Sequence, residues 1–83
     1  MEDIRSILAR FPMRELEIRR LCARDVRFRS VCRDYEEAAA ALRYWRNVSS
    51  DYAARIEEYE SFLGELEAEI LGRLESARAS EKA

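Results

Sequence analysis

The sequence has no histidine, only two cysteines and a single proline among its 83 residues. A structural zinc site needs four ligands, usually cysteine or histidine at short spacings, so this composition predicts no metal site. Cys22 and Cys32 lie ten residues apart. On one helix that spacing is about 15 Å, which is too far for a disulfide. We therefore expect both cysteines to be structural thiols that behave as small apolar residues.

The sequence also lacks a long apolar run. No stretch approaches the roughly twenty apolar residues that a membrane-spanning helix requires. The first residues, MEDIRSILARF, mix charged with apolar side chains and do not resemble a secretory signal. With cysteines that form no disulfide framework, these features favour the cytoplasm. We expect no membrane contact, no cofactor and no small-molecule substrate.

The many carboxylates do not indicate a catalytic site. Six glutamates lie between residues 57 and 69, but they flank apolar positions at helical spacing. Catalytic carboxylates need a pocket that shifts their pKa, and two or three packed helices offer little concavity. We expect these side chains to form a solvated helix face and the protein not to be an enzyme.

Apolar residues recur every three or four positions from residue 28 onward. This spacing is typical of the a and d heptad positions of helices that pack side by side. The first series is Phe28, Val31, Tyr35, Ala38, Leu42 and Trp45, and the second is Tyr52, Ile56, Tyr59, Leu63, Leu66 and Ile70. The sequence therefore predicts two long amphipathic helical stretches.

A shorter segment precedes them. Apolar residues between Ile4 and Phe11 predict a short helix or ordered arm, which Pro12 separates from a second short helix over 13–23. The apolar residues of that second helix are Leu16, Ile18, Leu21 and Cys22. Asp25 is a candidate N-cap, because its carboxylate can accept hydrogen bonds from the first amides of the next helix.

The stretch RNVSSDY, residues 46–52, decides the shape of the chain. The heptad spacing continues through it, which favours one continuous helix in a coiled-coil dimer. However, Ser49, Ser50 and Asp51 are good N-caps, Asn47 suits a C-terminal cap, and the two arms are nearly equal in length. These features favour an antiparallel hairpin with a turn at 47–51. The predicted all-α parts are a helical arm (1–24), hairpin helices (25–47 and 50–77) and a frayed tail (78–83).

The segments RELEIRRLCARDVRFRSVCRDYEEAAAALRYW and EEYESFLGELEAEILGRL resemble the YdcH-like family of small bacterial proteins of unknown function. The resemblance covers about residues 14–75, with Val26 where the family usually has proline. It implies a helical hairpin and brings no catalytic residues. The matching positions are Leu16, Leu21, Asp25, Phe28, Tyr35, Leu42, Leu66, Ile70 and Leu74.

Charge is unevenly distributed along the chain. Residues 1–33 carry a net charge of +4 and residues 34–83 a net charge of −6. The two ends therefore either attract each other or present a basic patch to a polyanion. Acidic residues interrupt the basic segment 19–33 and the pI is about 5.3, which favours the first interpretation and disfavours nucleic acid. The candidate polyanion patch is Arg19, Arg20, Arg24 and Arg27.

One hairpin leaves about half of its apolar seam in water, which costs about 25 cal/mol per Å². The alanine run 38–41 would let another helix approach closely. The candidate oligomer or partner interface is Phe28, Tyr35, Ala38, Ala39, Leu42 and Trp45. We expect a dimer or tetramer, or an unknown protein partner. The primary hypothesis is a non-enzymatic oligomeric interaction module, a small adaptor or regulator, and the alternative is a polyanion- or nucleic-acid-binding module using segment 19–33.

Overall fold

The structure is a computed structural model that describes residues 3–48 and 53–82, with Lys82 as backbone only. Every secondary-structure element in this part of the chain is helical, which confirms the all-α fold. The elements are α1 (Arg5–Arg10), a 3-10 turn η1 (Pro12–Arg14), α2 (Glu15–Arg24), α3 (Val26–Val48) and α4 (Ala53–Lys82).

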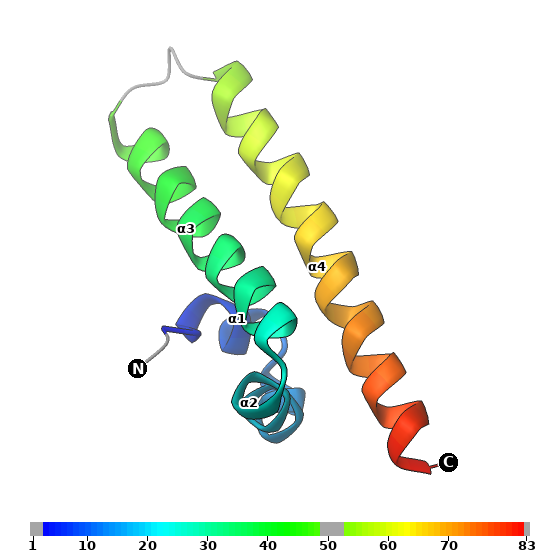
Figure 1. The fold of residues 1–83 in the computed structure, drawn as a ribbon. Coiled ribbons are helices and arrows are strands. Elements are labelled where there is room, and N and C mark those ends of the chain that lie inside the picture. Colours follow the sequence, from blue (N-terminus) through cyan, green and yellow to red (C-terminus); the bar gives the residue numbers. More distant parts are fainter. Residues whose placement is uncertain (1–2, 49–52, 83) are drawn as a thin grey trace.

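The two long helices, α3 and α4, lie side by side in opposite directions (Figure 1). Near the turn Arg46 pairs with Glu60. Farther from it the Tyr35 hydroxyl donates to Glu67 at 2.7 Å, so partner numbers rise along α4 as they fall along α3. The hairpin is therefore correct and the continuous helix is wrong. Most of the predicted turn, 49–51, lies outside the described residues.

The side chain of Asp25 separates α2 from α3. Its backbone is extended (φ −123°, ψ 106°), and its Oδ1 accepts from the amides of Arg27 at 2.9 Å and Phe28 at 3.1 Å. The predicted N-cap and helix break are confirmed, although no proline follows Asp25. At its other end α3 continues past Asn47 to Val48, so the predicted C-terminal cap at Asn47 is wrong.

The end of α4 is held by ion pairs rather than frayed. The helix continues to Lys82, so the predicted frayed tail is wrong over 78–82, and Ala83 lies outside the described residues. Arg78 donates to Glu17 of α2 at 2.6 Å, and Glu81 accepts from Arg24 at 3.1 Å. An exposed pair of this kind contributes at most about 1 kcal/mol, but both pairs tie the same final turns of α4 to α2.

Helix α1 depends on a contact from α3. It has only six residues, and its N-cap residue Ile4 makes no side-chain hydrogen bond to it. A helix this short is unstable in isolation. Asp3 Oδ1 accepts from the amide of Arg5 at 3.1 Å, and the Glu36 carboxylate accepts from the amides of Ser6 at 3.3 Å and Ile7 at 3.0 Å. A negative charge at a helix N-terminus is favourable, so Glu36 both caps α1 and fixes its place on α3.

The N-terminal helices cover only the half of the hairpin that lies away from the turn (Figure 1). Heptad residues in that half are buried, whereas Trp45, Ile56 and Tyr59 near the turn are only half-buried. Leu16 is 61% exposed, so its predicted place in the apolar stripe of the second helix is wrong. The core consists of Ile4, Ile7, Ile18, Leu21, Phe28, Val31, Cys32, Tyr35, Ala38, Leu66, Ile70 and Leu74.

Substitution within the alanine run tests this packing. Ala39 is buried, on the same face of α3 as Glu36 and Arg43, which both bond to α1. We expect Ala39→Arg to destabilise the chain by about 1–3 kcal/mol through overpacking, with a further cost for the buried charge. Each kcal/mol lowers Tm by about 4–8 °C in a domain of this size.

The neighbouring residue supplies the control. Ala40 is exposed, so Ala40→Arg should change stability by only a few tenths of a kcal/mol. Thermal unfolding followed by circular dichroism measures both effects. Equal melting temperatures for the two variants would contradict the placement of Ala39 against α1.

Candidate interaction surfaces

The predicted oligomer interface lies mostly inside the chain. Its members Phe28, Tyr35, Ala38, Ala39 and Leu42 are all buried by contacts within the single chain. Only Trp45 remains half-exposed, and the Arg55 guanidinium lies 4.7 Å from the centre of its ring. The N-terminal arm and α4 already cover these positions, so any partner must contact other residues.

The basic N-terminal segment pairs with the acidic second arm. Arg10 lies 3.1 Å from Glu67, and Arg14 lies 2.8 Å from Glu75. The Arg24–Glu81 pair at the end of α4 extends this series, whereas Arg78–Glu17 joins the same helices with the charges reversed. The interpretation that the two ends of the chain attract each other is therefore confirmed.

All four residues of the predicted polyanion patch are exposed. Two already have acidic partners: Arg19 pairs with Glu15 at 2.8 Å, and Arg24 pairs with Glu81. Among the described residues, no recorded ion pair involves Arg20 or Arg27. The patch therefore retains positive charge in the middle of α2 and at the start of α3.

An open groove of about 650 Å³ adjoins this patch, between the α2–α3 junction and α4. Arg24, Arg27 and Arg73 line it, but so does Asp25. Arg73 also pairs with Glu69 at 3.0 Å. The charge of the groove is consequently mixed rather than uniformly positive.

A second polar network joins three helices. The Tyr35 hydroxyl donates to Glu67, whose other carboxylate oxygen pairs with Arg10. Burial, reinforced by the hydrogen bond to Glu67, raises the pKa of Tyr35 well above its ordinary value. Tyr35 therefore stays a neutral donor at physiological pH, and the network ties α1 to both hairpin helices.

Replacing this donor gives a direct test. In Tyr35→Phe the Glu67 carboxylate keeps Arg10 as its partner, so the loss should be limited to roughly 1–2 kcal/mol of unfolding free energy. Tyr44→Phe is the matched control, because Tyr44 is 59% exposed and its hydroxyl removal should cost less than about 0.5 kcal/mol. Urea denaturation measures both. Equal midpoints would show that the hydrogen bond adds nothing to stability.

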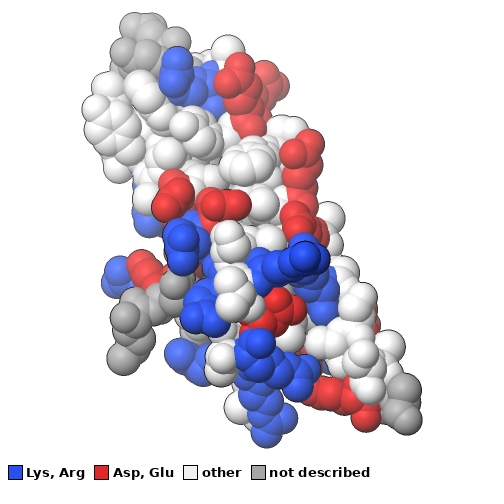
Figure 2. All heavy atoms as spheres, in the orientation of Figure 1, with Lys and Arg blue, Asp and Glu red and all other residues white. Residues whose placement is uncertain are grey.

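Large apolar side chains are exposed on α2 and the residues around it. Met13 is 93%, Leu16 61% and Val26 73% exposed. Arginines lie among them, and Figure 2 shows basic side chains concentrated at this end of the molecule. We call this surface the basic face; its residues are Met13, Leu16, Arg19, Arg20, Val26 and Arg27.

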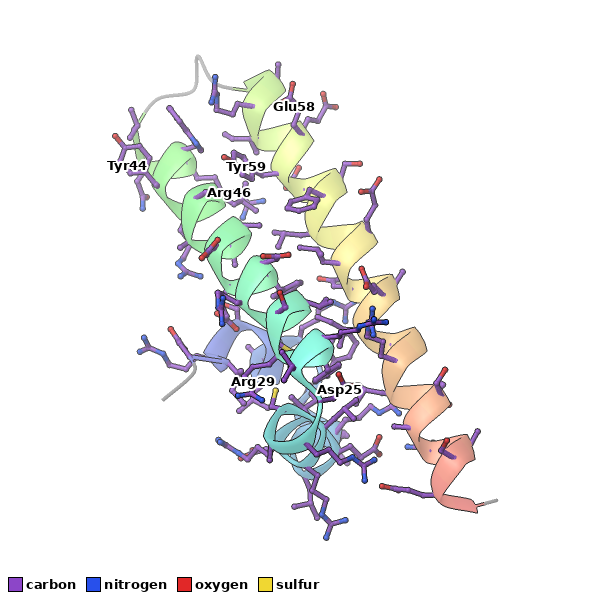
Figure 3. All side chains as sticks on the ribbon, in the orientation of Figure 1. Asp25, Arg29, Tyr44, Arg46, Glu58 and Tyr59 are labelled. Carbon is purple, nitrogen blue, oxygen red and sulfur yellow. The ribbon has the colours of Figure 1, made fainter. Side chains whose placement is uncertain are left out.

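A second apolar surface lies near the turn. Tyr44 is 59%, Val48 48% and Phe62 43% exposed. Figure 3 shows Tyr44 pointing outward from α3 and Glu58 outward from α4, whereas Tyr59 lies between the two helices. Figure 2 shows uncharged surface there, with acidic side chains along α4 beside it.

The heptad register defines this surface. Residues at the g and c positions lie on one side of both helices, opposite the side of α3 that α1 covers. Five of the ten members are acidic and only one is basic. We call it the acidic face; its residues are Asp34, Glu37, Ala41, Tyr44 and Val48 on α3, and Arg55, Glu58, Phe62, Glu65 and Glu69 on α4.

The sequence interpretation missed the apolar members of the acidic face because it followed only the a and d positions. The available signal was Tyr44, Val48 and Phe62 at g and c, where charged residues are usual. Among the described residues, no group of three or more potential metal ligands occurs. None of the described helices has the length and hydropathy needed to cross a membrane.

Comparison with known proteins gives no assignment. No protein-family model matches the chain. No curated protein and no solved structure is significantly similar to it. The resemblance to the YdcH-like family therefore stays a prediction.

The pairing of the two ends predicts a pH dependence. The Arg14 guanidinium, and after it that of Arg78, lowers the pKa of Glu17 below its ordinary value. A group with a lowered folded pKa stabilises the fold above its unfolded pKa, and this contribution is lost as the pH falls. We expect Glu17→Gln to melt below the parent at pH 7, and the difference to shrink below about pH 4.3.

Melting curves across pH measure this difference. Glu57→Gln removes the same charge from an exposed position and serves as the control. If the melting temperature of Glu17→Gln stayed below that of the parent by the same amount down to pH 2, the assigned ion pairs would be contradicted.

Proposed function

We propose that this chain is a non-enzymatic, self-associating helical interaction module, in which the basic face of one copy binds the acidic face of another. The observation that carries the proposal is the exposure of large apolar side chains on two surfaces of opposite charge. Leu16 and Val26 represent the first surface, and Tyr44 and Phe62 the second. Exposed apolar patches rimmed by charge are typical of protein–protein contact sites.

The charges favour this pairing over a symmetric contact. Two acidic faces brought together would oppose carboxylates such as Glu58 and Glu65 with their own copies, and like charges across an interface are destabilising. Arg20 and Arg27 on the basic face meet those carboxylates with opposite charge. A contact between two different surfaces of one chain is heterologous, and it ends at a closed ring such as a fourfold tetramer when the rotation between copies closes.

The proposal requires no catalysis. The carboxylates of the acidic face are on the outer sides of the hairpin, where they serve as a charged rim around apolar side chains. A small module that joins copies of itself, or holds a partner in the same way, fits the role of an adaptor or regulator.

The second candidate function is polyanion binding by the basic face. The open groove with Arg24, Arg27 and Arg73 favours it. Asp25 in the same groove and the Arg24–Glu81 pair oppose it. Exposed Leu16 and Val26 also suit an apolar partner better than a phosphate backbone, whose contacts are mainly with charged and polar groups.

Complementation between two variants tests the heterologous contact. Phe62→Arg adds positive charge to the acidic face, and Leu16→Glu adds negative charge to the basic face. Each variant alone should be monomeric by light scattering. Every contact between two identical copies pairs an altered face with an unaltered one, and the altered face repels its partner face or fails to fit it. An equimolar mixture should form a one-to-one complex, since Phe62→Arg keeps a normal basic face and Leu16→Glu a normal acidic face.

Two substitutions at exposed positions outside both faces are the controls: Ser61→Arg and Ala40→Glu should retain the parent's mass. The complex should weaken as salt is raised, because exposed charges are screened. A symmetric contact through the acidic face would instead leave Leu16→Glu fully associated by itself. A monomeric parent at high micromolar concentration would overturn the proposal, and tight salt-dependent retention of that monomer on heparin would support the polyanion alternative.

A further inference from the structure

The two cysteines lie next to each other in space. Their Sγ atoms are 3.8 Å apart, with Cys22 on α2 and Cys32 on α3. The expectation that they cannot meet assumed one helix, and it is wrong because the break at Asp25 folds α2 back against α3. The sulfur atoms are therefore in van der Waals contact, and a disulfide bond would bring them to about 2.05 Å.

The two thiols differ in access to solvent. Cys22 is half-buried, whereas Cys32 is only 1% exposed. An outside reagent therefore reaches Cys22 first, and the neighbouring Cys32 is placed to react with whatever forms there. This is the arrangement of an attacking and a resolving cysteine.

An arginine with a buried Nε precedes Cys32 on α3. Arg29 precedes Cys32 by one turn, and residues three apart lie on the same face of a helix. Its Nε is buried and has no hydrogen-bond partner among the described residues. The thiolate is the form that attacks a disulfide; in general a guanidinium close to a thiol favours that form, and apolar burial opposes it.

We propose that Cys22 and Cys32 form a redox-active dithiol that is oxidised to an intramolecular disulfide by exchange with low-molecular-weight or protein disulfides. The Cys22 thiolate attacks one sulfur of the incoming disulfide, forms a mixed disulfide and releases the first thiolate. The Cys32 thiolate then attacks Cys22 Sγ and releases the second. Two electrons pass from the protein to the incoming disulfide, and the two thiol protons go to the released thiolates.

The resulting bond links the C-terminal part of α2 to the first turns of α3. It closes a short loop around Asp25, so oxidation stabilises the break that the N-cap already defines. The proposal is independent of self-association, because neither cysteine belongs to the basic or the acidic face.

Equilibration of the full-length chain in glutathione and glutathione disulfide tests the proposal. Mass spectrometry after acid quenching should show a parent lighter by two hydrogen atoms and without a bound glutathione. Cys32→Ser should instead accumulate one glutathione on Cys22, because no resolving thiol is present. Cys22→Ser should stay unmodified over the same time, because Cys32 is buried.

Comparison of the folded and the urea-unfolded parent separates a preorganised pair from two cysteines that are merely close in sequence. The effective concentration of the two thiols should be about tenfold or more higher in the folded chain, since folding holds them in contact. An equal or lower value in the folded chain would overturn the proposal. So would a folded parent that carries glutathione on Cys22 or forms only intermolecular disulfides.

Discussion

The hydrogen bonds from the Asp25 carboxylate to the first amides of α3 are the local interaction on which the tertiary arrangement depends. They end one helix and begin the next without a loop. Had α2 and α3 been one continuous helix, the N-terminal arm would extend away from the hairpin. The break instead returns α2 onto α3 and α4, so that Ile18 and Leu21 become part of the core. An N-cap of this type contributes roughly 0.5–2 kcal/mol of stability. This free energy is small, but the cap determines which apolar side chains become buried, and their burial contributes much more.

The second constraint is that two helices cannot cover each other's apolar stripes completely. In the half of the hairpin away from the turn, α1 and α2 supply the missing cover, and Phe28, Ile70 and Leu74 are almost fully buried there. Glu36 and the Tyr35–Glu67–Arg10 network fix α1 in that place. In the half next to the turn no third helix is present among the described residues. This asymmetry gives the molecule a closed end and an apolar open end.

Charge follows the same division. Arginines near the N-terminus pair with glutamates of α4, and these pairs stabilise the closed end. Because part of the positive charge of the first half is paired in this way, the unequal charge of the two halves does not make the chain a simple polybasic binder. Exposed pairs of this kind contribute little individually, but several of them join the N-terminal helical arm to α4. The charges left over form two surfaces of opposite sign. Self-association through those surfaces is the function that we propose.

The amino-acid sequence was enough to predict the helical class, the heptad seams and the cap at Asp25, because each depends on residues close together in the chain. It also predicted, though not uniquely, the hairpin and the attraction between its ends. Which half of the seam is covered follows only from the three-dimensional arrangement, because it depends on the direction in which α2 returns after Asp25. The same return brought Cys22 against Cys32, removed Ala39 and its neighbours from the candidate interface and left Leu16 exposed. Such pairings join residues from different helices, and helical periodicity alone carries no information about them.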